Sequence, residues 1–368
     1  MSGLAAGAAV QGRAVALARA ICEVAAPPFH EACRADFVHG LWCAAGLEAR
    51  LDAIGNVVAE VPGGSGPRVV LASHLDTVFA AGTDVTVRES DERWHAPGLG
   101  DNSASLGVLT AWAEGVASGD ASPRPQVVLA ATVGEEGLGD LRGAKALVRD
   151  LAGSVDAFVA IDGHLGGVVH QAVGSIRFEV EYRGPGGHSW GDFGTASAVH
   201  AVGEAIHALA RIELPKTPRS SLNVGLVQGG TGVNAIAALA SCVVDVRSVD
   251  QQELLRLAGE AERRCRSIAR RYGLEVQITR VGERPAAVGG NEALVAAAER
   301  ALRSVDVQPH RSASSTDANA AMAAGIPALC FGVYRGGDAH RSSEWIDPAS
   351  LDVGLAALRA FLRELAQA

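Results

Sequence analysis

The chain has 368 residues, a formal net charge of -9, 48% hydrophobic residues and 20% charged residues. This length exceeds the size at which one hydrophobic core usually suffices, so we expect two domains. The acidic net charge argues against broad nucleic-acid binding, because such binding needs a basic surface that displaces counterions. We therefore expect a globular protein that has no nucleic acid as a partner.

The 6 cysteines are scattered and form no C-x-x-C pair, which argues against a thiolate zinc site and against a disulfide framework. Arg13 and Arg19 interrupt the alanine-rich start of the chain, so we expect no signal-peptide core there. No later segment is long and uncharged enough to predict a membrane span. These features predict a cytoplasmic protein without a membrane partner.

The first part of the chain alternates helical and extended patterns. Apolar residues recur at helical spacing from Ala8 to Val24, and Pro27-Pro28 ends that run. Three later runs are continuously apolar, which is typical of strands buried on both faces of a sheet. These runs are Val69 to Ala72, Gln126 to Thr132 and Ala157 to Ile161. We expect further helices over 31–45, 103–116 and 144–151, and extended segments over 48–51 and 56–61.

The pattern changes near Gly174, where Ser175 to Tyr182 alternates strictly, as a half-exposed antiparallel strand does. The following segments predict a helix, two strands, a helix and a strand, over 197–211, 221–227, 241–247, 251–272 and 274–281. The order βαββαβ is that of a ferredoxin-like unit. After Pro285 the α/β pattern returns, with helices expected over 292–303 and 317–324 and a strand over 327–332. We therefore expect an α/β domain formed by residues 1–173 and 285–368, interrupted by an α+β domain formed by residues 174–284.

Five side chains of the types that bind metals follow predicted strands or glycine turns. They are His74, Asp101, Glu136, Asp162 and His340. An open α/β sheet gathers such residues at the carboxyl ends of its strands. Asp101 lies in a glycine turn before a helix, where its two oxygens are available to bridge two ions. The mixed nitrogen and oxygen set, without a thiolate, favours two divalent ions of the Zn²⁺, Co²⁺ or Mn²⁺ type.

Two further carboxylates have a chemical role in this hypothesis. Asp76 lies two residues after His74 on an extended backbone, so its carboxylate points to the same side and is expected to hold the imidazole tautomer. Glu135, next to Glu136, is not among the five predicted ligands. Its carboxylate is therefore available for proton transfer between an attacking water and a leaving amine. The pattern predicts a two-metal hydrolase.

These motifs resemble those of the dinuclear-zinc metallopeptidase family that includes peptidase T, carboxypeptidase G, succinyl-diaminopimelate desuccinylase and aminoacylase. The resemblance covers essentially the whole chain and rests on His74-x-Asp76, Gly100-Asp101-Asn102, Glu135-Glu136, Asp162-Gly163, Gly187-His188-Ser189 and His340. It implies a zinc-exopeptidase-like catalytic domain with an inserted ferredoxin-like lid and dimerisation domain. It also implies that Glu135 is the general base, that Glu136 is a ligand and that Asp101 bridges. Asp162 is most similar to the peptidase T branch, whereas Trp190 and Asp192 differ from the smaller, less charged loop expected there.

The resemblance also implies residues that contact the substrate. His188 is expected to stabilise the oxyanion of the tetrahedral intermediate. Asn234 is expected to hydrogen-bond to the substrate, and Arg247 to hold a substrate carboxylate in a fork. Asp317 and Asn319 are equally well explained as substrate contacts or as caps of the next helix.

The leading functional prediction is a metal-dependent aminopeptidase or dipeptidase that acts on short peptides. The alternative is an amidohydrolase that releases an amino acid from an N-acyl or N-aryl conjugate. A non-catalytic binding module would be expected to lose the ligands or the base, and this chain keeps all of them. In the resembling family, lids pair two-fold and bring the lid histidine into the partner's active site, and an exposed sheet edge suits such pairing. We therefore expect a homodimer.

Overall fold

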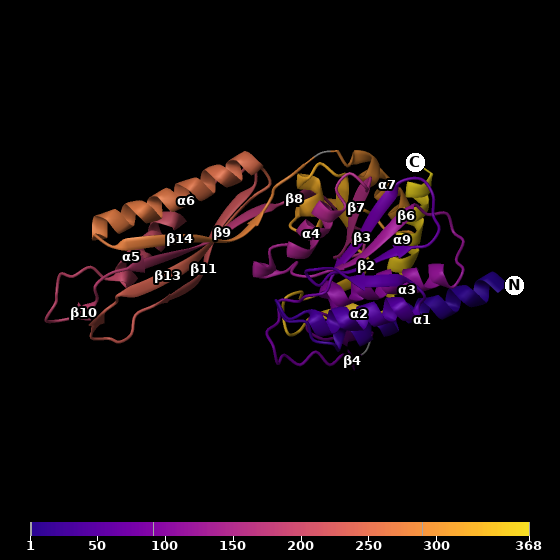
Figure 1. Ribbon diagram of the computed structural model, residues 1–368, viewed down its shortest axis with the longest axis horizontal. Helices are drawn as coiled ribbons and strands as arrows, with labels where there is room; N and C mark the ends of the chain where they lie inside the picture. The colour runs from indigo at the N-terminus through magenta and orange to yellow at the C-terminus, as the bar shows by residue number, and fades with distance from the viewer. Residues whose placement is uncertain (1, 91, 289, 368) are drawn as a thin grey trace. The chain divides into compact units, whose positions relative to one another are not determined.

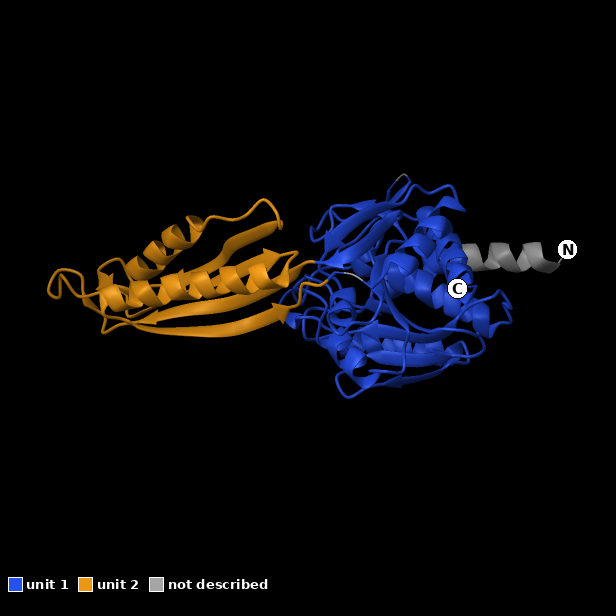
Figure 2. Cartoon of the chain, turned by 90° about the horizontal axis from the view of Figure 1, so that it is seen from above, with its two compact units in different colours: residues 1–172, 288–368 blue, residues 173–287 orange. Residues whose placement is uncertain are grey.

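The computed structural model describes residues 2–90, 92–288 and 290–367. Contacts between Cα atoms divide the chain into two compact units (Figure 2), and each unit is described by itself. Unit 1 comprises Met1–Ala172 and Val288–Ala368, and unit 2 comprises Val173–Ala287. Within the described ranges, no helix combines the length and the apolar character needed to cross a bilayer.

Unit 1 is built on an 8-stranded mixed sheet (Figure 1). Its strands in spatial order are β1 (Glu48–Leu51), β2 (Val57–Val61), β6 (Gln126–Thr132), β3 (Arg68–His74), β7 (Ala157–Ile161), β16 (Ala328–Phe331), β8 (Gly167–Ala172) and β15 (His310–Ser314). Strand β3 pairs in parallel with both β6 and β7. Every residue of β3 after Arg68 is buried, as expected of a strand covered on both faces. The carboxyl ends of these three strands therefore meet at one edge of the sheet.

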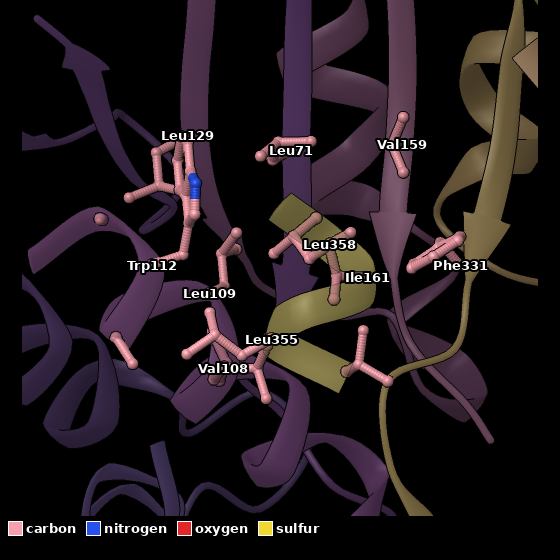
Figure 3. Close-up of a cluster of buried hydrophobic side chains, with 14 of the residues drawn as sticks. Leu71, Val108, Leu109, Trp112, Leu129, Val159, Ile161, Phe331, Leu355 and Leu358 are labelled. Carbon is pink, nitrogen blue, oxygen red and sulfur yellow. The ribbon is translucent and has the colours of Figure 1, made fainter. Parts of the chain in front are cut away.

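Helices pack around this sheet and on one another. They are α1 (Ser2–Cys22), α2 (Ala32–Ala44), α3 (Ser105–Ala117), α4 (Arg142–Asp150), α7 (Glu292–Arg303), α8 (Ala318–Ala323) and α9 (Ser350–Ala366). Figure 3 shows part of the resulting core, in which side chains of β3, β6, β7 and β16 face side chains of α3 and α9. The labelled residues are Leu71, Val108, Leu109, Trp112, Leu129, Val159, Ile161, Phe331, Leu355 and Leu358. This packing gives the strand ends a rigid support.

A second, small sheet of unit 1 was not predicted from the sequence. Its strands in spatial order are β17 (Arg335–Gly337), β18 (Trp345–Asp347), β5 (Arg93–His95) and β4 (Arg88–Ser90). Strands β8 and β15 of the large sheet were also missed. The four strands of the small sheet have only 3 residues each, too few for a period of two to stand out.

Unit 2 has the element order predicted for a ferredoxin-like unit. Its main elements are β9 (Gly174–Arg183), α5 (Ala198–Ala210), β11 (Ser220–Gly229), β13 (Leu239–Ser248), α6 (Gln251–Tyr272) and β14 (Glu275–Arg284), with the short strands β10 (Gly187–His188) and β12 (Ala235–Ile236) paired to each other. The spatial order of the main sheet is β11-β13-β9-β14, so β11 is an edge strand. Helix α6 begins with a side-chain cap: the Asp250 side chain accepts the Glu253 N–H at 2.8 Å. It ends at Gly273, whose φ of 64° suits a helix C-terminus.

Candidate active site

The strand ends of unit 1 carry four of the acidic and imidazole side chains predicted to form the site. His74 ends β3, Glu135 and Glu136 follow β6, and Asp162 follows β7. Asp101 lies in an irregular helical turn, Leu99–Ala104, that leads into α3. The remaining residue, His340, lies in the loop that connects β17 to β18. The parallel order of β6, β3 and β7 thus explains why segments far apart in the sequence meet here.

The geometry brings these side chains together around Asp101. Nε2 of His74 lies 3.0 Å from Oδ1 of Asp101, and Nε2 of His340 lies 3.0 Å from Oδ2. His340 Nε2 is also 3.1 Å from Oε1 of Glu136. These contacts join the loop of His340 to the ends of two strands.

Three groups of side chains have potential ligand atoms within 4.8 Å of one another. They are His74 with Asp101 and Asp162, Asp101 with Glu136 and His340, and His74 with Glu135 and Glu136. Asp101 belongs to the first two groups, which are therefore two neighbouring candidate ligand sets with one shared carboxylate. Each of these two groups offers one imidazole nitrogen and carboxylate oxygens, a donor set that suits Zn²⁺ and related divalent ions.

The role of Asp76 differs from the one expected. Nδ1 of His74 is 3.0 Å from the backbone carbonyl oxygen of Asp76, whereas the Asp76 carboxylate lies 3.8 Å away. The two carboxylate oxygens instead accept the backbone N–H groups of Glu135 (2.9 Å) and Glu136 (2.8 Å). The backbone carbonyl therefore sets the tautomer of His74, and the buried carboxylate of Asp76 shapes the turn that presents both glutamates.

Charge crowding at the site shifts several pKa values. Burial by itself would lower the pKa of His74, but hydrogen bonding to Asp101 and its charge outweigh this and hold the pKa well above its usual value. Hydrogen bonds to Asp101 and Glu136 raise the pKa of His340 to about 10. Burial raises the pKa of Asp162 to about 7, and the negative charge of Asp101 acts in the same direction. Such a concentration of carboxylates and imidazoles is the electrostatic setting in which divalent cations bind.

Two buried charged residues that support this site were missed in the sequence. Arg34 is 0% exposed and donates hydrogen bonds to the backbone carbonyls of Val24, Leu75 and Cys22, at 2.7, 2.8 and 3.3 Å. It thus holds the residue between His74 and Asp76. Burial lowers the pKa of Arg34 to about 10.

The second missed residue is Glu344, four positions after His340. Its carboxylate accepts the backbone N–H groups of Gly98, Gly100 and Asp101. Burial raises the pKa of Glu344 to about 7, while these three N–H groups act in the opposite direction. The sequence offers one indication that Glu344 belongs to the site, which is its position four residues after His340. No local pattern predicts its contact with Gly98, which lies 246 residues away in the sequence.

Asp317 and Asn319 lie at the start of α8 in unit 1. The Asp317 side chain does not cap this helix; its Oδ2 accepts a hydrogen bond of 2.5 Å from Oγ1 of Thr132, at the end of β6. The Asn319 side chain accepts the backbone N–H of Thr316 at 3.0 Å. Both residues are buried. Asp317 thus lies beside the strand that leads to Glu135, whereas Asn319 contacts a backbone N–H three residues away.

His188, Asn234 and Arg247 belong to unit 2. Nδ1 of His188 accepts the backbone N–H groups of Trp190 and Gly191, each at 3.2 Å. These contacts place the hydrogen of the neutral ring on Nε2, because Nδ1 is used as an acceptor. The backbone carbonyl of Asn234 accepts the Ser189 N–H at 2.9 Å, and the Arg247 Nε donates to Asp245 at 2.7 Å. The His188 loop therefore presents an exposed N–H donor.

Comparison with known proteins identifies a matching family and similar structures. Residues 70–364 match the family described as Peptidase family M20/M25/M40. A putative succinyl-diaminopimelate desuccinylase of Mycobacterium tuberculosis is 26% identical, covering 96% of this chain and 99% of its own length. An acetylornithine deacetylase of Myxococcus xanthus is 32% identical over 54% of each chain. The crystal structure of a tripeptidase from Staphylococcus aureus superimposes with a TM-score of 0.80 at 22% identity, covering 97% of this chain and 99% of that one.

The match extends over most of the chain, from β3 to α9, and includes the strands and loops that gather around Asp101. The protein therefore belongs to peptidase family M20/M25/M40 and is a hydrolytic enzyme of the peptidase and amidohydrolase class.

Proposed function

We propose that the protein cleaves the amide bond of short peptides, as an aminopeptidase or dipeptidase, with two divalent ions. The observation that carries this proposal is the pair of ligand groups that share Asp101. Asp101 would bridge, with His74 and Asp162 holding one ion and Glu136 and His340 holding the other. Zn²⁺ suits this donor set best, with Co²⁺ or Mn²⁺ as alternatives. When bound, the ions polarise the scissile carbonyl and lower the pKa of the attacking water.

Glu135 is the proton carrier in this proposal. It is 6% exposed and lies in a ligand group with His74 and Glu136, close to both imidazole and carboxylate atoms. A carboxylate placed there accepts the proton of the attacking water and then donates it to the nitrogen of the leaving amine. The Asp76 carboxylate supports this role because it holds the Glu135 backbone N–H.

Three residues of unit 2 are proposed to contact the substrate. His188 would donate its Nε2 hydrogen to the substrate oxygen as negative charge develops on it, and the two N–H groups on Nδ1 support that tautomer. Asn234 and Arg247 would bind the polar end and the carboxylate of the substrate. In unit 1, Asp317 and Asn319 would be further substrate contacts.

We also propose a homodimer in which His188 serves the partner's site. Strand β11 is an unpaired edge of its sheet, and Leu226 and Val227 on it are 58% and 55% exposed. Exposed apolar residues on an edge strand favour pairing with a second chain. A cytoplasmic location is part of the proposal and is supported by the six free cysteines.

The second candidate is an amidohydrolase that acts on an N-acyl or N-aryl amino acid. The names of two relatives, a desuccinylase and a deacetylase, favour it. The two functions differ at the nitrogen end of the substrate, because an aminopeptidase binds a free α-amine and a deacylase binds an acyl group.

Matched substrates separate the two functions. We would measure kcat/KM for a panel of dipeptides and tripeptides, for the same peptides with an acetylated amino terminus, and for the corresponding N-acetyl amino acids. The proposal expects at least tenfold preference for free peptides, and chelator-treated enzyme is the control for contaminating activity. Hydrolysis of N-acetyl amino acids alone would establish the second candidate.

A further inference from the structure

The loop that carries His340 contacts the Asp101 turn through a second side chain, Glu344. Oε1 of Glu344 accepts the backbone N–H groups of Gly100 at 2.7 Å and Asp101 at 2.8 Å, and Oε2 accepts that of Gly98 at 3.0 Å. Glu344 is only 1% exposed. Within residues 2–90, 92–288 and 290–367 it forms no ion pair with a cationic side chain. Its charge is compensated by backbone N–H groups of one turn.

Burying a carboxylate without a cationic partner costs desolvation free energy. The groups that hydrogen-bond to it therefore indicate what the carboxylate contributes to the structure. When Glu344 is ionised, each of the three hydrogen bonds is charge-assisted and stronger than a bond between neutral groups. They act on a turn of irregular conformation: φ and ψ are -107° and 90° at Asp101 and -132° and 26° at Asn102. Such a turn lacks the repeating backbone hydrogen bonds of a regular helix. Acceptors outside the turn are therefore needed to bind its N–H groups and fix its conformation.

Two residues of one loop therefore contact Asp101, one at its side chain and one at its backbone. His340 contacts its side chain, with Nε2 3.0 Å from Oδ2, and Glu344 contacts its backbone N–H. We infer that Glu344 is a positioning residue that orients Asp101 for simultaneous contact with both metal ions. This inference rests on the proposed function, in which Asp101 bridges.

The chemistry of the contact predicts graded effects of substitution. Glu344→Gln keeps one carbonyl oxygen, which can still accept from Gly100 and Asp101, but turns an amide NH₂ toward the Gly98 N–H. Glu344→Ala removes all three acceptors. Gly100→Ala is an independent perturbation, because its new Cβ would lie 3.0 Å from Oε1 of Glu344 and 2.9 Å from Cε2 of Tyr334. Metal affinity should fall from wild type to Glu344→Gln, and further from Glu344→Gln to Glu344→Ala.

A matched control is available at the opposite end of β3. Oδ2 of Asp156 accepts the backbone N–H of Arg68 at 2.7 Å, at the start of that strand. Asp156→Asn makes the same change from carboxylate to amide on a backbone N–H group, but away from the candidate ligands. It should leave metal binding unchanged.

The test measures Zn²⁺ affinity by competition with a chromophoric chelator, and the number of ions per chain by elemental analysis. Loss of a residue that orients a ligand typically weakens metal binding by 10-fold to 100-fold. We expect a weakening of about tenfold or more for Glu344→Gln and a larger one for Glu344→Ala. In the metal-free protein, amide hydrogen exchange over residues 96–105 should be faster in both variants than in wild type and Asp156→Asn.

Wild-type affinity in Glu344→Gln and Glu344→Ala would overturn the inference, and so would faster exchange with unchanged metal affinity, which indicates a role in folding alone. If Glu344→Ala does not fold, Glu344→Gln and Gly100→Ala decide the outcome. Wild-type protein that binds no Zn²⁺ would overturn the proposed function itself and this inference with it. That result differs from failure of the inference alone, in which wild type and variants bind Zn²⁺ equally well.

Discussion

Nε2 of His340 lies 3.0 Å from Oδ2 of Asp101, although 239 residues separate the two in the sequence. The other oxygen of the same carboxylate, Oδ1, has His74 Nε2 at 3.0 Å. Each oxygen of Asp101 therefore faces one imidazole, and the carboxylate separates two clusters of potential ligands.

Removal of divalent metal should abolish hydrolysis, because in the proposed mechanism the bound ions polarise the substrate carbonyl and lower the pKa of the attacking water. After chelation and dialysis, Zn²⁺, Co²⁺ or Mn²⁺ should restore turnover, and elemental analysis should find close to two ions per chain. Mg²⁺ and Ca²⁺ are the matched controls, since they prefer sets made only of oxygen ligands and should restore much less. Full activity of metal-depleted protein would disprove the mechanism.

Glu135 and Glu136 should respond differently to the same isosteric change. If Glu135 carries only the proton, Glu135→Gln should retain the ions while turnover falls by roughly a hundredfold or more. Glu136→Gln should instead weaken the site that it shares with His340 and Asp101. Each variant is the control for the other, with metal content and turnover measured on the same samples. Equal metal loss in both, or substantial turnover by Glu135→Gln, would contradict the assignment.

Asp76→Asn should damage the turn that presents the two glutamates. An amide can accept only one of the N–H groups of Glu135 and Glu136, and its NH₂ would face the other. The unsatisfied donor should lower the free energy of unfolding by about 1–3 kcal/mol, measured by urea denaturation, and turnover should fall with it.

Asp120→Asn is the control for this change, since Oδ1 of Asp120 accepts the Ser122 N–H in a surface turn of unit 1. It should leave turnover unchanged. Normal turnover in Asp76→Asn would show that the position of the two glutamates does not depend on the Asp76 carboxylate.

Metal binding should release protons and strengthen as pH rises. The pKa of His340 is raised to about 10 and that of His74 lies well above its usual value, so in the metal-free protein the site favours the protonated form of both imidazoles. Ligands bind ions in their deprotonated form, so protons compete with the ions below these pKa values. Asp162, with a pKa of about 7, adds to the same trend. Calorimetric titrations in two buffers of different ionisation enthalpy should show release of more than one proton per chain at neutral pH. An affinity that does not change between about pH 6 and 8 would refute this account.

Subunit exchange tests the proposed action of His188 in the partner's site. Glu135→Ala and His188→Ala should each be nearly inactive as homodimers. Equal amounts, unfolded and refolded together, should give half mixed dimers, each with one intact site of two. About one quarter of wild-type activity should return. No recovery despite demonstrated exchange would show that His188 serves its own chain or has no catalytic part, and a monomeric mass would remove the premise.

The sequence by itself determined which residues could gather at the strand ends. The continuous apolar runs before His74, Glu135 and Asp162 predicted buried strands, and these are observed as β3, β6 and β7. Burial on both faces leaves a local pattern, and parallel strands bring their carboxyl ends to one edge. Helix α6 is likewise observed over Gln251–Tyr272, the range predicted from the sequence, because helical periodicity is also a local signal.

Only the tertiary structure decided which polar atoms pair with which. The spacing of His74 and Asp76 favoured a contact between imidazole and carboxylate, but the fold uses that carboxylate for two backbone N–H groups after β6. The contacts of Glu344 and Arg34 join segments that have no common periodicity. A hydrophobic pattern indicates which face of a helix or strand is buried. The partner of a buried charge instead depends on loop conformation and on packing between distant segments.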